Sequence, residues 1–281
     1  MPELPEVQTT VDGLNRTVKG REIVNVETTY NSKFYKGKED IKNPEFFKKF
    51  RKQVVGQKIL KAERRAKNIL IRLSNGKTIL VHMKMTGHFV YNKPSHPFIR
   101  LDFELDNGKH LSLSDMRRFA KVTFLNPKHL EDLGPEPLDK NFQFSSFKFQ
   151  LMKRPKARMK QALMDQSLIA GIGNIYSDEI LWRSCIHPLS LVKDVPEKNL
   201  KFAFSVMKEV LQKGIDFGGD SMSDYRNIMG EKGQFQEYHR AYRRHKTRCS
   251  KKNCPGTLER VVVGARSAHF CPVHQKLYAK K

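Results

Sequence analysis

The sequence predicts an α+β protein: a leading helix and an antiparallel β-sandwich, then a helical half and a terminal β-hairpin. Three observations carry this prediction. Alternating apolar residues and Asn-Gly turns occupy roughly the first 125 residues, helical segments follow, and three of the four cysteines crowd the C-terminal end. Strands followed by helices, without alternation between them, are typical of the α+β class.

The first helix is expected over residues 2–18. Its apolar stripe has helical spacing and consists of Val7, Val11, Leu14 and Val18. From about residue 21 to 125 the pattern becomes that of strands. Asn-Gly between two such segments predicts a hairpin, because both turn positions need positive φ. The expected hairpins are 68–73 with 78–85 around Asn75-Gly76, and 100–105 with 110–113 around Asn107-Gly108.

The strand pattern stops after Asn126, and a linker with the sequence Gly134-Pro-Glu-Pro137 follows. A later helix has the apolar stripe Leu200, Phe204, Met207 and Leu211, whereas 218–233 lacks periodicity and predicts a long functional loop. The predicted divisions are a sandwich domain 1–126, a linker 127–140, a helical domain with the loop 141–240, and a metal-binding hairpin 241–281.

Charge is the strongest bulk signal. The 281 residues include 53 Lys and Arg against 29 Asp and Glu, a formal net charge of +24. Clustered cations gain free energy by releasing counterions from nucleic acid, so a polyanionic partner is expected; a merely solvated basic surface is the plainer alternative. No apolar run is long enough for a membrane span, and the N-terminus lacks a signal-peptide pattern. We therefore expect a cytoplasmic protein without a membrane partner.

Four metal ligands are expected near the C-terminal end. Cys249 and Cys254 form one close pair, and Cys271 and His274 form another after sixteen intervening residues. Two close pairs of sulfur and nitrogen donors suit tetrahedral Zn²⁺. Since four protein ligands fill that coordination shell, we expect one structural Zn²⁺ and no catalysis at the metal.

The N-terminal sequence Met1-Pro-Glu-Leu-Pro-Glu6 allows two interpretations. Pro2 suits a first helical turn, and Glu3 and Glu6 suit its positive end, so the segment can simply start a helix. If Met1 is removed, Pro2 instead presents a secondary α-amine beside two carboxylates. Such an amine has a pKa of about 7.7–8.0, against about 10.4 for Lys, and can attack an electrophilic carbon at neutral pH. Its adduct with a sugar C1′ is an iminium, which acidifies the C2′ proton for elimination.

Motifs along nearly the whole chain are specific in their order, although each is weak alone. They are Pro2-Glu-Leu-Pro-Glu-Val7, Arg64-Arg-Ala-Lys67, His82-Met-Lys-Met-Thr-Gly87, Asp115-Met-Arg-Arg-Phe119, Gly134-Pro-Glu-Pro-Leu138, Gly171-Ile-Gly-Asn-Ile-Tyr176 and Ile186-His-Pro188. With the terminal finger, they resemble the formamidopyrimidine-DNA glycosylases of the Fpg/Nei superfamily, and within it the Fpg branch.

The resemblance implies a monomeric, two-domain DNA-repair enzyme without an organic cofactor, acting at the nucleoid. A β-sandwich faces a helix–two-turn–helix domain with a zinc finger, and damaged duplex DNA binds between them. The implied activities are excision of oxidised purines such as 8-oxoguanine and formamidopyrimidines, and cleavage of the resulting apurinic or apyrimidinic site. In that scheme Pro2 forms a Schiff base with C1′, and β- and δ-elimination follow.

The same resemblance assigns roles to individual residues. Glu3 shuttles a proton at the sugar ring oxygen and Glu6 supports it, while Lys67 and Arg266 contact phosphate and assist proton transfer. Met85, Arg117 and Phe119 fill the space left by the flipped nucleotide, which offsets a cost of a few kcal/mol. The further expected DNA contacts are His82, His96, Lys156 and Asn174.

Three features depart from the family pattern. The first metal pair is spaced by four residues and the last ligand is His274, where the family commonly has two Cys-x2-Cys pairs. The segment 30–55 is longer and more basic than usual, and Phe98 stands where a second His is common. The alternatives are the Nei branch, which prefers oxidised pyrimidines and usually has Gly where this chain has Leu4; a non-catalytic DNA-binding protein; and an RNA-binding zinc ribbon.

Overall fold

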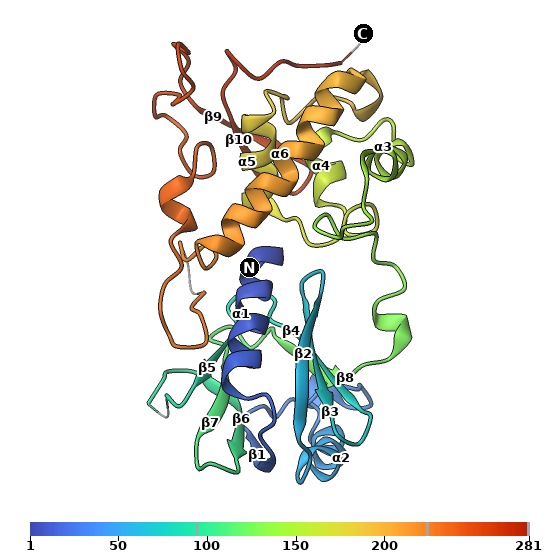
Figure 1. Ribbon diagram of the computed structural model, residues 1–281, viewed down its shortest axis with the longest axis vertical. Helices are drawn as coiled ribbons and strands as arrows, with labels where there is room; N and C mark the ends of the chain where they lie inside the picture. Colours follow the sequence, from blue (N-terminus) through green and yellow to red (C-terminus); the bar gives the residue numbers. More distant parts are fainter. Residues whose placement is uncertain (94, 223–224, 280–281) are drawn as a thin grey trace. The chain divides into compact units, whose positions relative to one another are not determined.

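The computed structural model describes residues 1–93, 95–222 and 225–279 and divides into two compact units (Figure 1). The N-terminal unit comprises Met1–Glu131 and Phe217–Gln236, and the C-terminal unit comprises Asp132–Asp216 and Glu237–Lys281. The segment Phe217–Gln236 thus packs with the N-terminal unit, although it falls within the range predicted for the helical domain. Within the described ranges no helix has both the length and the apolar character that a membrane span requires.

A β-sandwich of two four-stranded antiparallel sheets forms the N-terminal unit, as predicted (Figure 1). The strand order is β1-β6-β7-β5 in one sheet and β2-β3-β4-β8 in the other. Alternation buries one face of each sheet: Leu101, Phe103 and Leu105 are all in the core. The strands are β1 (Ile23–Thr28), β2 (Ile59–Arg65), β3 (Asn68–Leu73), β4 (Thr78–His82), β5 (His88–Tyr91), β6 (Ile99–Leu105), β7 (His110–Ser114) and β8 (Lys121–Phe124).

Helix α1 (Leu4–Thr17) covers one side of this core with the predicted stripe of Val7, Val11 and Leu14. It begins two residues later than expected, so Pro5 and not Pro2 stands in its first turn. Asn15 ties α1 to β2, because its side chain donates to Ala62 O (2.9 Å) and accepts from Ala62 N (2.8 Å).

The prediction of strands throughout 21–125 is wrong at Pro44–Val54, which form helix α2. The side chain of Asn43 caps this helix by accepting a hydrogen bond from Glu45 N (3.2 Å), and Pro44 occupies its first turn. Phe50 packs against Phe124 of β8, with ring centroids 5.1 Å apart. The cap at Asn43 and the packing of Phe50 on Phe124 therefore stabilise a helix within a segment whose neighbours form strands.

Helices build the C-terminal unit, as predicted. They are α3 (Phe144–Met152), α4 (Met159–Met164), α5 (Asn174–Arg183) and α6 (Glu197–Asp216). Leu200, Met207 and Leu211 of the predicted stripe are buried, and α6 lies so close to α5 that a Cβ on Gly214 would meet Tyr176 at 2.5 Å. Short 3-10 turns occur at Lys33–Tyr35, Pro127–His129, Val192–Asp194 and Phe235–Tyr238.

The chain ends in the predicted β-hairpin, formed by β9 (Glu259–Val263) and β10 (Arg266–Phe270). Gly264 has φ +62° in the two-residue turn between them, which explains its glycine. The buried cysteines of this region pack with Leu258 and with Trp182 of α5 in a small core of their own.

Candidate functional site

The N-terminal end of α1 is buried, although it begins the chain. Pro2, Glu3 and Glu6 are all buried, whereas Met1 is 41% exposed. Glu3 N donates a hydrogen bond to Glu6 Oε2 (2.7 Å), which holds the two acidic residues together at the positive end of the helix. The predicted nucleophile and both predicted carboxylates therefore form one compact group.

Glu6 also binds the long loop predicted at 218–233. Its Oε1 accepts from Asp220 N (2.8 Å), and its carbonyl oxygen accepts from the hydroxyl of Tyr225 (3.1 Å). Gly219 has φ +86°, and a Cβ there would lie 2.9 Å from Cγ of Glu6, so only glycine permits this approach. Ser223 and Asp224 of the predicted loop lie outside the described residues.

A second anchor holds the same loop to α1. Tyr91 N donates to Ile228 O (2.8 Å), and a Cβ on Gly13 would lie 2.5 Å from the side chain of Ile228. The loop therefore reaches both the start and the middle of α1, which explains why it groups with the N-terminal unit.

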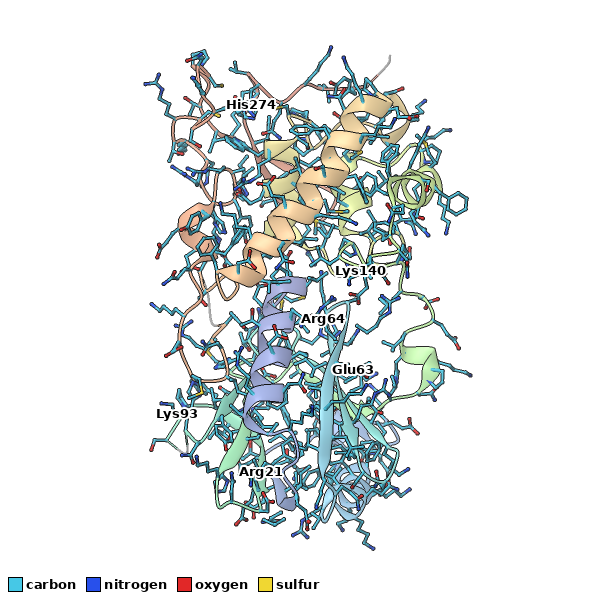
Figure 2. All side chains as sticks on the ribbon, viewed as in Figure 1. Arg21, Glu63, Arg64, Lys93, Lys140 and His274 are labelled. Carbon is cyan, nitrogen blue, oxygen red and sulfur yellow. The ribbon has the colours of Figure 1, made fainter. Side chains whose placement is uncertain are left out.

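Lys67 lies in the turn between β2 and β3, directly after Ala66, which has φ 55°. Arg64 Nε donates to Gln8 Oε1 (2.8 Å), and Figure 2 labels Arg64 beside α1. Because Ala62 contacts Asn15 and Arg64 contacts Gln8, β2 runs toward the start of α1. The turn with Lys67 is consequently brought to the N-terminal end of α1, which Pro2 and Glu3 directly precede.

His82 ends β4, opposite Asn68 on one side and Lys121 on the other. Its Nδ1 accepts a hydrogen bond from Lys84 N (3.0 Å), so the proton of the neutral ring is on Nε2. Burial, and then the charges of Lys84 and Lys67, lower the pKa of His82 to about 3. The ring is thus neutral at physiological pH and offers Nε2–H as a donor.

A buried carboxylate organises the loop after β7. Asp115 accepts hydrogen bonds from the hydroxyl of Tyr30 (2.9 Å), from Thr86 Oγ1 (2.6 Å) and from Ala120 N (2.8 Å). Thr86 in turn accepts from Arg117 N (3.0 Å). Two loops that are thirty residues apart in sequence are therefore held as one structure.

That structure presents the three predicted void-filling side chains to solvent. Met85 and Phe119 are large hydrophobic residues that remain 40% and 50% exposed. The guanidinium carbon of Arg117 lies 4.7 Å from the ring centroid of Phe119, close enough for a cation–π contact. Exposed apolar side chains on a rigid, buried support are suited to insertion into another molecule.

His96 is half-buried, and its ring meets that of His88 edge-on at 5.1 Å. Phe98, which departs from the family pattern, has φ 61° and is 49% exposed. Both residues line a cavity of about 190 Å³ together with Met116 and Arg226. His96 is thus brought next to the loop of Arg117 and Phe119.

In the C-terminal unit, Asn174 is the first residue of α5. Its Oδ1 is buried and has no hydrogen-bond partner among the described residues. Gly134 packs on the turn before α5: a Cβ there would lie 2.7 Å from the carbonyl groups of Ser167 and Leu168. Lys156 is exposed between α3 and α4, and Arg266 is exposed at the start of β10.

A buried ion pair between α4 and α5 also supports the terminal hairpin. Lys160 Nζ donates to Asp178 Oδ1 (2.6 Å) and to Asn174 O (3.2 Å). The other oxygen of Asp178 accepts from His269 N in β10 (3.0 Å). The turn with Asn174 and the hairpin with Arg266 therefore share one fully buried support.

The four predicted metal ligands converge, and their donor atoms all lie within 4.8 Å of one another. Cys254 Sγ lies 3.6 Å from Cys271 Sγ, and Cys249 Sγ lies 3.3 Å from His274 Nδ1. Tetrahedral Zn²⁺ with bonds of about 2.0–2.3 Å requires separations of about 3.3–3.8 Å, so the donor set fits a metal ion. His274 (labelled in Figure 2) aligns its Nε2 with Trp182 O (3.1 Å), which orients the ring.

Several supporting residues were missed in the sequence analysis. Asp220 and Tyr225, which contact Glu6, lie in a loop without periodicity, and Lys160 and Asp178 read as ordinary helical charges. Asp115 belongs to a recognised motif, yet its buried role has no signal in spacing. Only their burial, visible in three dimensions, distinguishes them from surface charges.

Comparison with known proteins accounts for this arrangement. A family model of the formamidopyrimidine-DNA glycosylase N-terminal domain matches residues 1–122, and one of the H2TH domain of the same enzymes matches residues 133–226. The chain belongs to the formamidopyrimidine-DNA glycosylase family. The predicted fold and family are thereby confirmed, and the chain is a DNA glycosylase and AP lyase of DNA repair.

Individual relatives span the whole chain. The formamidopyrimidine-DNA glycosylase of Protochlamydia amoebophila is 36% identical over 98% of this chain and 100% of its own length, and that of Herpetosiphon aurantiacus is 34% identical with the same coverage. Among solved structures, a mutant of the Lactococcus lactis enzyme in complex with Fapy-dG-containing DNA is similar, with a TM-score of 0.86. It is 28% identical and covers 98% of this chain and 100% of that one. The same enzyme with abasic-site DNA also has a TM-score of 0.86.

Proposed function

We propose that this enzyme excises oxidised purines, such as 8-oxoguanine and formamidopyrimidines, from duplex DNA through a Schiff base on Pro2. The observation that carries the proposal is the buried group of Pro2, Glu3 and Glu6, with Lys67 brought to the same end of α1. The Lactococcus lactis relative, crystallised with Fapy-dG and with abasic-site DNA, supports this substrate class.

The chemistry begins with Pro2 after Met1 has been removed, because only then is its nitrogen a free amine. The nitrogen attacks C1′, and the base leaves with the C1′–N bond electrons and a proton. The sugar ring then opens by breaking C1′–O4′; Glu3 delivers the proton to O4′, and the nitrogen lone pair completes the iminium. Glu6 holds Glu3 in place through the 2.7 Å hydrogen bond.

The iminium accepts the electrons of the C2′–H bond, and the 3′-phosphate leaves in β-elimination. A second elimination releases the 5′-phosphate, leaving a one-nucleotide gap with phosphate ends. Lys67 and Arg266 hold the flanking phosphates and assist these proton transfers. Both are cations and suit that role electrostatically.

DNA binding uses exposed and partly buried residues of both units. The phosphate contacts are His82, which donates through its neutral Nε2–H, His96, Lys156 and Asn174. Asn174 is the first residue of α5, so the phosphate there is also stabilised by the helix N-terminus. Met85 and Phe119 fill the space of the flipped nucleotide, and Arg117 hydrogen-bonds the orphaned cytosine.

We further propose that Cys249, Cys254, Cys271 and His274 hold one structural Zn²⁺. The donor spacing supports zinc, and four protein ligands leave no open position for substrate. The metal would hold the hairpin so that Arg266 at the start of β10 reaches DNA. The enzyme would act as a monomer on damaged duplex DNA.

Borohydride trapping tests the proposal. The protein is incubated with an 8-oxoguanine:C duplex and sodium borohydride, which reduces a Schiff base to a stable protein–DNA adduct. We expect an adduct with the wild-type chain and none with Pro2→Gly. Absence of a wild-type adduct would contradict the mechanism, and faster reaction with an oxidised-pyrimidine duplex would instead favour the Nei-type preference.

A further inference from the structure

A cavity of about 420 Å³ in the N-terminal unit is rich in positive charge. Its lining consists of four lysines, two carboxylates and three aromatic rings: Lys38, Lys42, Lys84, Lys121, Glu39, Asp40, Tyr35, Phe119 and His129. Lys38 and Lys42 belong to the long basic segment 30–55, for which no role is predicted from the sequence. Part of the segment 30–55 therefore lines the same cavity as Phe119, which belongs to the exposed loop after β7.

Lys42 forms the fixed floor of the cavity. It is buried, its ammonium donates to Ala120 O, and it lies 3.8 Å from the Asp40 carboxylate. It also lies over the rings of Tyr35 (4.8 Å) and Tyr30 (5.4 Å). Since Ala120 N is held by Asp115, these contacts connect the basic segment directly to the loop that carries Phe119.

The four lysines outnumber the two carboxylates that line the cavity, Glu39 and Asp40. Within residues 1–93, 95–222 and 225–279, neither Lys84 nor Lys121 forms an ion pair. Burial, followed by the charges of Lys121 and Lys42, lowers the pKa of Lys84, and burial followed by Lys121 lowers that of His129 at the same cavity. An excess of cations over carboxylates, held close together, is the condition under which an anion binds with a gain in free energy.

Phe119 indicates which anion fits. Its ring lines the cavity, and its ring centroid lies 4.7 Å from the guanidinium carbon of Arg117. The cavity therefore adjoins Phe119 and Arg117, which in the proposed function face the orphaned cytosine. A DNA strand whose base meets Arg117 carries its backbone phosphates past the neighbouring surface. Lysines provide point charges for such phosphates without reading sequence.

We propose that the cavity of Lys38, Lys84 and Lys121 binds a backbone phosphate of the DNA strand opposite the lesion. This inference rests on the proposed function only for the identity of that strand. It adds a contact on the undamaged strand, to which the segment 30–55 contributes Lys38, to those expected at the lesion.

The first test measures the affinity of the full-length protein for a lesion duplex at several salt concentrations. The double variant Lys38→Ala/Lys121→Ala removes one phosphate contact, so the slope of log K against log salt becomes less negative by about 0.9. Lys109→Ala is the matched control, because Lys109 also lies over an aromatic ring (Tyr91, 5.7 Å) but outside the cavity. An unchanged slope in the double variant would overturn the proposal.

The second test locates the phosphate. Single phosphates of the duplex are replaced in turn by neutral methylphosphonates, and each duplex is bound to wild type, to the double variant and to Lys121→Arg. We expect one position on the opposite strand to weaken wild type and Lys121→Arg but to have no further effect on the double variant. Coupling only on the lesion strand, or at no position, would contradict the proposal.

Borohydride trapping on the same proteins keeps this inference distinct from the proposed function. Failure of wild type to form an adduct would count against the function, whereas the salt slope and the phosphate coupling decide the cavity.

Discussion

The metal-binding hairpin and the N-terminal end of α1 are fixed in different ways. The hairpin takes its four donors from Cys249–His274, a stretch of 26 residues, and is recognisable from spacing alone. The N-terminal site depends on contacts between residues more than two hundred positions apart, such as Glu6 with Asp220. The difference teaches that the donors of a proposed metal site can be local in sequence, whereas the carboxylates beside the proposed nucleophile are held by residues distant in the chain.

The two regions also use histidine in related ways. In His274 the Nδ1 atom faces the sulfur donors and Nε2 lies 3.1 Å from a carbonyl oxygen. In His82 the Nδ1 atom accepts a backbone N–H, which leaves Nε2–H to donate outward. The same tautomer therefore orients the ring of His274 in the hairpin and gives His82, at the end of β4, the Nε2–H that contacts a phosphate in the proposed function.

Of the changes that distinguish the two regions, removal of the metal is expected to have the largest effect, on the folding of the hairpin and on DNA affinity. Cys271→Ser, or a strong chelator, should unfold the hairpin, because structural zinc contributes about 10–16 kcal/mol in zinc-finger peptides. Loss of the Arg266 contact, at about 1.5–3 kcal/mol, should then weaken DNA binding about ten- to a hundredfold in fluorescence anisotropy. His274→Cys should retain one zinc per chain by elemental analysis; a hairpin that stays folded without metal would contradict the proposed role.

Loosening the contact between Glu6 and the loop 218–233 is expected to have the next largest effect, on the rate of base excision. Gly219→Ala places a methyl group 2.9 Å from Cγ of Glu6 at a backbone with φ +86°. We expect single-turnover base excision to fall about tenfold, which corresponds to about 1.4 kcal/mol. Gly218→Ala is the matched control, since it has a similar φ of +70° but meets only Gly233 Cα at 3.7 Å. Equal losses in both variants would show that backbone strain alone, and not Glu6, is responsible.

The smallest effect concerns the protonation of His82. Its pKa of about 3 predicts imidazole ¹⁵N resonances that do not titrate between pH 8 and 5 in the DNA-free protein. The unfolded chain takes up this proton near pH 6.5, so stability is lost as pH falls from about 6.5 toward 3. His82→Gln should reduce that pH dependence, and an NMR titration with a midpoint above pH 5 would contradict the burial argument.

Much of the fold follows from the sequence for identifiable reasons. The Asn-Gly turns predict the hairpins of β3 with β4 and of β6 with β7, and the stripe of Leu200, Met207 and Leu211 predicts α6. Helix α2 was missed because its signal, Asn43 before Pro44, is a short cap within a long strand pattern. Local signals of this kind are weak until tertiary packing, here Phe50 on Phe124, selects between them.

The candidate site was predictable only in part. Pro2, Glu3 and Lys67 stand out through their motifs, and the metal ligands through their spacing. The supports Asp115, Asp178 and Asp220 are carboxylates in ordinary sequence surroundings, and their importance comes from burial among residues distant in the chain. Pairing of that kind is a property of the folded chain, which no periodicity reveals.

Localisation of the reduced adduct tests the central claim about Pro2 most directly. After borohydride trapping with an 8-oxoguanine:C duplex, the adduct is digested with protease and nuclease and sequenced by tandem mass spectrometry. We predict that the sugar remnant lies on the α-nitrogen of a peptide that begins at Pro2, with Met1 absent. A remnant on Lys67, or on a peptide that still carries Met1, would contradict the mechanism.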